Sequence, residues 1–130
     1  MISASDGDPT QSDGVKALVN QYFQRLLNEK DLSACDEMLS DEYIDHDAPP
    51  DTLPGPQSIK EFVTRFLETY PDMHVDVEDL LVEGNKVAVR LVWQGHDRES
   101  GDRFHQEGII FLRFNDKGQF VERWSAYKSL

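Results

Sequence analysis

Two neighbouring residues in the first half of the chain have the side chains that proton transfer needs. His46 carries an imidazole that titrates near neutral pH, so in a dry pocket it can take a proton from a substrate and return it. Asp47 can act as a base instead, because an apolar wall raises the pKa of a carboxylate. In an extended segment, alternation puts Tyr43 and Asp47 on one side and His46 on the other. The two candidates therefore cannot easily serve one pocket, and a solvated loop is the alternative for each.

His96 and His105 flank a polar connection, residues 97–102, that would bring their imidazoles near each other. Each is a candidate catalytic or polar group of a pocket, and the alternative is an exposed histidine at a strand end. No third ligand follows at the spacing of a metal site, so zinc is not expected here.

Glu107 and Glu122 fall within segments rich in β-branched and aromatic residues, where an inward carboxylate is costly unless it is paired. A cross-strand ion pair is the favoured interpretation for both. The candidate partners are Arg90, Arg113 and Arg123. Glu122 also remains a candidate catalytic acid.

Aromatic side chains suited to a flat or polycyclic ligand occur in the predicted third helix and in the strands. They are candidate substrate-binding residues, and a simple core role is the alternative for each. The set is Tyr43, Phe62, Phe66, Trp93, Trp124 and Tyr127.

The composition excludes several classes of partner. The 130 residues include 25 acids and 13 bases, which gives a formal net charge of -12. Because no basic patch is available, neither nucleic acid nor an anionic membrane is expected to bind. The longest apolar runs are too short to span a bilayer and no signal-peptide pattern opens the chain, which favours a cytoplasmic protein. The single cysteine, Cys35, is expected to be a small buried apolar residue.

Three amphipathic helices are predicted to follow a short tail. Residues 1–11 are rich in Ser, Asp, Gly, Pro and Thr and predict a disordered acidic tail, which leaves 12–130 as one domain. Apolar residues then recur at helical spacing over 12–27, over 32–39 and over 56–70. Ser12 or Asp13 can cap the first helix, Asp31 the second, and Pro56 fits the first turn of the third.

After Pro71 the apolar period changes to two, which predicts long strands joined by short turns. The first strand starts near Met73, and its alternation slips near Asp79, which indicates a bulge or bend. The second covers 87–96, and the last two form a hairpin over 103–127. The turn of this hairpin allows two registers, which stay open.

Helices first and strands afterwards indicate an α+β domain with a mostly antiparallel sheet packed against three N-terminal helices. Strands of this length with a slipped phase favour a curled sheet over a flat one. A curled sheet has a hollow side, which the helices cover incompletely, so a pocket is expected.

Motifs over residues 14–127 resemble the SnoaL-like polyketide cyclase family. In chain order they are Tyr43-Ile-Asp-His46, Gly55, Ile59-Lys-Glu-Phe62, Tyr70-Pro-Asp72, Val87-Ala-Val-Arg90, Gly95-His96, Phe114 to Gly118, and Val121-Glu-Arg-Trp124. The resemblance implies the cone-shaped, nuclear-transport-factor-2-like fold, a cystatin-like α+β roll. It also implies a homodimer, an apolar pocket inside the cone, His46 near the mouth of this pocket, and proton-transfer chemistry without a metal or an organic cofactor.

One departure keeps two functions open. Polyketide cyclases of this type commonly carry an acid–base Asp shortly after the Trp of the last strand, whereas Trp124 is followed here by Ser125-Ala-Tyr-Lys128. The first hypothesis is a cofactor-independent cyclase, isomerase, dehydratase or hydrolase acting on a small hydrophobic, cyclic or polyketide-like compound. The alternative is a non-catalytic ligand-binding or dimerising domain of the same fold.

Overall fold

The first helical segment packs along the hollow of the sheet. The computed structural model describes residues 9–130. Helix α2 (Pro9–Phe23) continues into a π-helical turn, η1 (Gln24–Asn28). The helix begins at Pro9, earlier than the capping argument predicted, since proline fits a first turn that needs no amide donor. Residues 1–8 of the predicted tail therefore lie outside the described residues. The apolar residues at helical spacing do point inward: Leu18 is half-buried, and the others, Val15, Val19, Tyr22, Phe23, Leu26 and Leu27, are buried.

The second helix, α3 (Ser33–Met38), is shorter than predicted because the chain turns directly into a strand, β1 (Leu39–Asp45). The carboxylate of Asp31 accepts a hydrogen bond from the first amide of this helix, at 3.1 Å to Ser33 N. Cys35 is fully buried as predicted, and burial raises the pKa of its thiol to about 11. This helix therefore serves packing, and its thiol is unreactive at neutral pH.

The third helix, α4 (Pro56–Thr69), starts at Pro56 as predicted and ends shortly before Pro71. Gly55 precedes it with a φ of 98°, a conformation that favours glycine, and a side chain there would press on the carbonyl oxygen of Asp41. The Gly55 amide donates to Tyr43 O at 2.8 Å, which ties the helix start to β1. The apolar side of α4 consequently faces the interior while its start closes one end of the hollow.

Five strands form one sheet in the order β1-β5-β4-β3-β2. The long strands are β2 (His74–Glu83), β3 (Lys86–His96), β4 (Arg103–Phe114) and β5 (Phe120–Ser129). These four pair antiparallel, as predicted, and the register shift between Val77 and Asp79 confirms the slip read from the alternation. The unpredicted feature is β1, which adds to the sheet edge parallel to β5.

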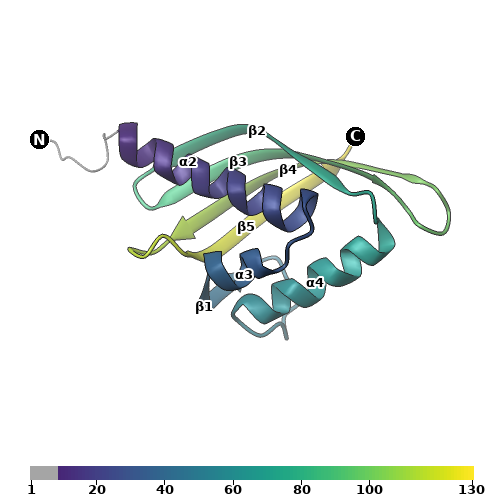
Figure 1. The fold of residues 1–130 in the computed structure, drawn as a ribbon, viewed down its shortest axis with the longest axis horizontal. Coiled ribbons are helices and arrows are strands. Elements are labelled where there is room, and N and C mark those ends of the chain that lie inside the picture. The colour runs from purple at the N-terminus through teal and green to yellow at the C-terminus, as the bar shows by residue number, and fades with distance from the viewer. Residues whose placement is uncertain (1–8) are drawn as a thin grey trace, which may run out of the picture.

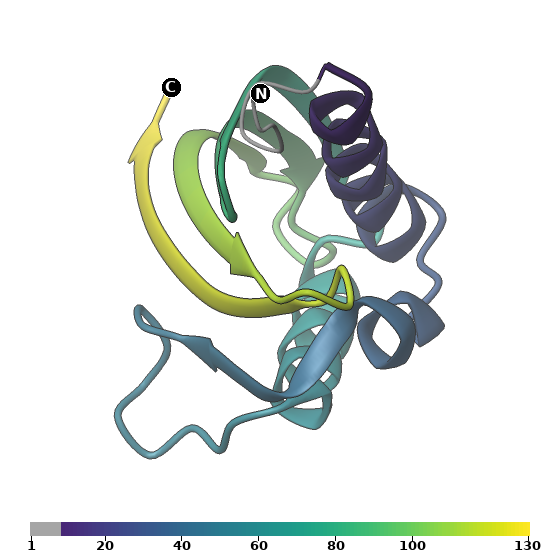
Figure 2. The ribbon, with the colours of Figure 1, turned by 90° about the vertical axis from the view of Figure 1, so that its left-hand side faces the viewer.

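The sheet curls, and the helices lie on its hollow side (Figures 1 and 2). Regular alternation sends Val87, Val89, Leu91 and Trp93 of β3 into this hollow, and all four are buried. The predicted α+β roll is therefore confirmed. None of the helices within residues 9–130 is long and apolar enough to cross a bilayer.

Candidate functional site

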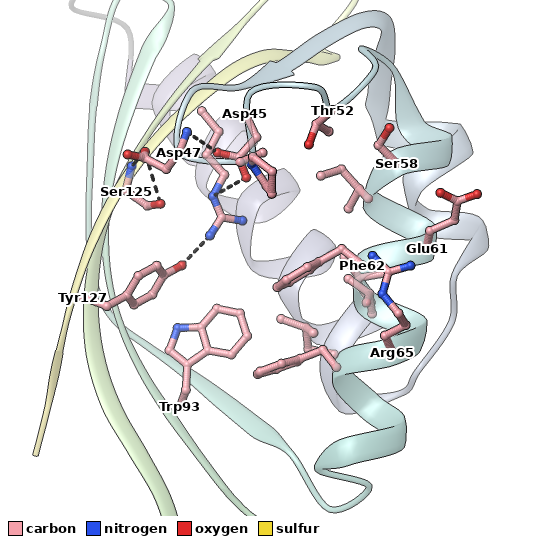
Figure 3. Close-up of a pocket in the computed structure, with 18 of the residues that line it drawn as sticks. Asp45, Asp47, Thr52, Ser58, Glu61, Phe62, Arg65, Trp93, Ser125 and Tyr127 are labelled. Atoms are coloured by element: carbon pink, nitrogen blue, oxygen red, sulfur yellow. Dashed lines mark hydrogen bonds and ion pairs between the residues drawn. The ribbon is translucent and has the colours of Figure 1, made fainter.

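A pocket of about 900 Å³ lies between the hollow of the sheet and α4. This volume falls in the range of small-molecule sites. Apolar side chains from η1, α4, β3 and β4 form most of its wall, and polar groups gather at one end. Figure 3 shows Trp93 and Tyr127 on the sheet side of the space and Phe62 and Arg65 on the α4 side. The shape suits a flat apolar ligand with a few polar atoms.

The aromatic wall is built by edge-to-face contacts. Phe66 of α4 meets the rings of Trp93 and Phe104 at centroid distances of 5.9 and 5.7 Å. Trp93 of β3 in turn meets Tyr127 of β5 at 6.2 Å, across the intervening strand β4. Tyr127 lies flat over Gly108, and any side chain at that position would overlap its ring. A glycine on the inner face of β4 therefore makes the room that Tyr127 occupies.

Asp47 and Ser125 define the polar end of the pocket. The Ser125 amide donates to Asp47 Oδ2 at 2.6 Å, and the Ser125 hydroxyl lies 3.4 Å from the same oxygen. The Asp47 amide donates to Asp45 Oδ1 at 3.0 Å. These bonds hold an otherwise exposed carboxylate against the last strand, with no hydrogen bond to its other oxygen among residues 9–130 (Figure 3).

Arg123 extends into the same wall, with only 16% of its side chain exposed. Its Nη2 donates to the Tyr127 hydroxyl, and its Nε lies 4.0 Å from Asp45 Oδ2. Burial by itself lowers the pKa of Arg123, but Tyr127, Tyr43 and Asp45 raise it above its ordinary value. Burial also raises the pKa of Tyr43 and of Tyr127. Arg123 is thus a permanent cation beside the neutral phenols of Tyr127, in the pocket lining, and Tyr43, in the core behind it.

His46, Glu122 and Trp124 lie on the opposite face of the sheet, so their expected place in the pocket is corrected. In the β1–β5 pairing Asp45 is opposite Arg123, and the flanking residues therefore point away from the pocket. His46 Nε2 lies 2.8 Å from Glu122 Oε2, and its ring stacks on Trp124 at 4.7 Å. Hydrogen bonds from His46 and Arg113 lower the pKa of Glu122. Of the neighbours His46 and Asp47, the structure brings only Asp47 to the pocket.

The other two histidine candidates also lie outside the pocket lining. His96 is exposed at the end of β3, where its Nδ1 lies 2.8 Å from Asp72 Oδ2, and this contact lowers the pKa of Asp72. His105 pairs in register with Gln94, and His96 pairs with Arg103, which makes the two histidines diagonal neighbours on the outer face of the sheet, away from the pocket. Their outward direction follows from alternation, because Trp93 and Gly95 take the inner positions.

Glu107 forms the cross-strand ion pairs predicted from its sequence position. Its Oε2 lies 3.0 Å from Arg90 Nη1, and its Oε1 lies 3.3 Å from Lys128 Nζ. Glu122 likewise pairs with Arg113. Both carboxylates therefore belong to the solvated outer face of the sheet.

Among the aromatic candidates, Phe62, Phe66, Trp93 and Tyr127 line the pocket. Tyr43 is buried in the core and is not part of the lining. Trp124 and Tyr127 are three positions apart along β5, an odd number, so a regular strand must place the two on opposite faces.

The sequence reasoning missed Asp45, Arg123 and Ser125 as pocket residues. The alternation of β5 could have identified Arg123 and Ser125, because it places them on the same face as Tyr127. They were missed because the prediction assigned Trp124, on the opposite face of β5, to the pocket. Within the described part of the chain, no three His, Cys, Asp or Glu side chains come together as a metal ion would require.

Comparison with known proteins points to one family. The family model described as "SnoaL-like polyketide cyclase" matches residues 17–130. TsrD from Streptomyces laurentii is a similar solved structure, with 26% identity, a TM-score of 0.80, and 89% of each chain covered. A comparison with curated proteins finds no significant match.

Two further solved structures share the fold. A candidate SnoaL-like polyketide cyclase from Jannaschia sp. CCS1 has 20% identity and a TM-score of 0.79, with 96% of this chain and 92% of that one covered. IdmH, a candidate polyketide cyclase from Streptomyces antibioticus, has 22% identity and a TM-score of 0.76, with 88% and 91% covered. At these identities the likeness concerns architecture alone.

Proposed function

The chain belongs to the SnoaL-like polyketide cyclase family, and on that premise we propose that it is a cofactor-independent acid–base enzyme. Its substrate would be a small hydrophobic, cyclic or polyketide-like compound. The observation that carries the proposal is a carboxylate, Asp47, held by two hydrogen-bond donors at the polar end of an apolar pocket. The same proposal includes a cytoplasmic location, which is typical of chains without a disulfide framework.

The hydrogen bonds between Asp47 and Ser125 support this proposal. Cyclases that this chain resembles commonly carry an acid–base Asp shortly after the last-strand tryptophan, and here the residue after Trp124 is Ser125. Ser125 binds the carboxylate of Asp47 through its amide and hydroxyl. A carboxylate thus reaches this part of the pocket from the segment after β1 instead of from β5 itself.

The proposed reaction is proton transfer at a carbon next to a carbonyl group. A flat ligand between α4 and the sheet would displace water from Asp47, and a desolvated carboxylate is a stronger base. Asp47 takes the C–H proton, and the electron pair left behind forms an enolate. In a cyclisation the enolate carbon attacks a second carbonyl of the same molecule, and protonated Asp47 returns its proton to the alkoxide oxygen.

Deuterium exchange tests this chemistry without knowledge of the natural substrate. The probe is 2-tetralone, a bicyclic ketone with acidic protons next to its carbonyl, incubated with the protein in D₂O and followed by NMR. We expect exchange about 100-fold or more above the buffer rate, as for a positioned general base. Exchange at the buffer rate, with the ketone bound, would contradict the enzyme proposal.

A non-catalytic pocket protein is the second candidate. The observation that favours it is the exposure of Asp47 in the free protein, together with the engagement of one of its oxygens by Ser125. Binding of the bicyclic ketone without exchange is the result that distinguishes this candidate from the enzyme.

We also propose that the chain forms a homodimer through the outer face of the sheet. Four apolar side chains are exposed there on β1, β4 and β5: Ile44, Ile109, Phe111 and Trp124. Isolated exposed apolar residues are ordinary, but neighbours on one face favour an interface. A second copy of the chain is the occupant that the family resemblance implies, and a two-fold axis would pair this face with itself.

Replacement of Phe111, which is 50% exposed, by Asp is expected to dissociate this dimer, because burying an unpaired carboxylate opposes association. Sedimentation velocity of the wild-type and Phe111→Asp proteins measures the change in mass. Leu53→Asp, at an exposed apolar residue of the segment between β1 and α4 and away from the outer face of the sheet, is the matched control and should leave the dimer intact. A wild-type monomer, or a dimer that persists in Phe111→Asp, would contradict the proposal.

A further inference from the structure

Arg123 is a cation in the pocket wall with few partners. Only 16% of its side chain is exposed, and its nearest carboxylate oxygen, Asp45 Oδ2, is 4.0 Å from Nε. Its Nε is buried and has no hydrogen-bond partner among residues 9–130. The one side-chain hydrogen bond that its guanidinium forms there goes from Nη2 to the Tyr127 hydroxyl. Of the five N–H donors of this guanidinium, the one on Nε therefore stays unpaired in the described chain.

The other arginines show what full pairing looks like in this chain. Arg90 lies 2.7 Å from Asp79 Oδ2 and 3.0 Å from Glu107 Oε2 on the outer face. Arg25 contacts both Asp31 and Glu37. The side chains of Arg90 and Arg25 are 37% and 22% exposed, whereas Arg123, at 16%, is the most buried of the three and has the poorest pairing. Burying a cation is unfavourable unless close partners compensate for its lost hydration, so packing alone does not explain Arg123.

A second unpartnered donor lies in the same wall. Trp93 Nε1 is buried and, like Arg123 Nε, has no acceptor within the described chain. Trp93 and Tyr127 meet edge to face, and Tyr127 is the residue that accepts from Arg123 (Figure 3). The wall thus holds two buried N–H donors that lack an acceptor, and a ligand oxygen would supply one.

We propose that Arg123 binds a negatively charged oxygen of the ligand, so that the pocket selects flat apolar compounds that carry a carboxylate, a phenolate or an enolate. The inference rests on the proposed function, since it names the substrate class of the same pocket. The protein as a whole has a net charge of -12, so a buried cation is the feature that would hold an anion there.

The position of Arg123 also fits the proton transfer. Arg123, Ser125 and Tyr127 occupy successive inward positions of β5, and Ser125 holds Asp47. The base and the cation therefore lie at the same end of the pocket. When Asp47 removes a proton, negative charge develops on the neighbouring carbonyl oxygen, where the guanidinium would stabilise it.

Calorimetric titration with two matched probes tests the selection at pH 7. The probes are 2-naphthoate and 2-naphthamide, which share a ring system and differ in charge. We expect the wild type to bind naphthoate about tenfold or more tightly than naphthamide, as for a charge-assisted hydrogen bond. Arg123→Met should abolish this preference and retain naphthamide binding. Arg103→Met, at an exposed arginine outside the pocket lining, should behave as the wild type.

Equal affinity of the wild type for both probes would overturn the inference, as would a preference that survives in Arg123→Met. If Arg123→Met does not fold by circular dichroism, Arg123→Lys takes its place. Lysine keeps the charge but loses the planar fork, so the preference should fall severalfold, and an unchanged preference would count against Arg123. If neither probe binds, the result contradicts both the proposed pocket function and this inference. An intact naphthoate preference without ketone exchange would support the inference and contradict catalysis alone.

Discussion

Replacement of Asp47 by Asn is expected to reduce protein-catalysed exchange of 2-tetralone by about 100- to 10,000-fold. The amide has the size of the carboxylate, and its oxygen can still accept the hydrogen bond from the Ser125 amide. It cannot accept a proton from carbon. The variant should therefore keep the position of the side chain and lose the base, and NMR exchange rates at constant pH measure the loss.

The control for this experiment is Asp116→Asn, which removes the same charge from an exposed turn between β4 and β5. It should exchange 2-tetralone at the wild-type rate. Ketone affinity, measured by titration, should be similar in Asp47→Asn and the wild type, because Asp47 is assigned to chemistry and the apolar wall to binding. Wild-type exchange in Asp47→Asn would show that another group removes the proton.

Replacement of Phe120 by Ala is expected to lower the free energy of unfolding by about 3–5 kcal/mol, the usual cost of a large-to-small change in a closed core. Phe120 is 1% exposed and packs edge to face on Tyr22 at 5.5 Å. It also starts β5, where it pairs with Leu39 of β1 and with Phe114 of β4. The cavity would open where three strands meet α2. Urea unfolding followed by circular dichroism measures the loss.

Phe62→Ala provides the comparison for stability, since Phe62 is 57% exposed on α4. Its truncation should change the free energy of unfolding by less than about 1 kcal/mol. Similar losses in Phe62→Ala and Phe120→Ala would mean that the end of the sheet near Phe120 is not the closed core described above.

The elements of this fold could be predicted from the sequence because their signals are local. Helical spacing in α2 and α4 and alternation in β3 each need only the residues of one segment. The register slip near Asp79 was visible for the same reason, since an extra residue inverts the alternation at that point. The ends of the helices were less certain. Helix α3 ends at Met38 because β1 starts at Leu39, and a strand is extended by a partner distant in sequence.

The candidate site was only partly predictable, and β5 shows why. Its alternation determines that Arg123 and Tyr127 share one face and that Trp124 faces the other way. Nothing within the strand says which face is hollow, because both contain aromatic and charged residues. That choice depends on the curl of the sheet and on the helices that cover one side of it.

The neighbours His46 and Asp47 show the same division between sequence and tertiary structure. The sequence alone indicated that they do not easily serve one pocket, because successive residues of an extended chain point to opposite sides. The parallel pairing of β1 with β5 decided between them, because it turns Asp45 toward Arg123 and His46 toward Glu122. This pairing joins segments almost 80 residues apart in sequence, as the contact of Asp47 with Ser125 shows. Side-chain periodicity is a property of a single strand, whereas the wall of a pocket is made by strands and helices that meet only after folding.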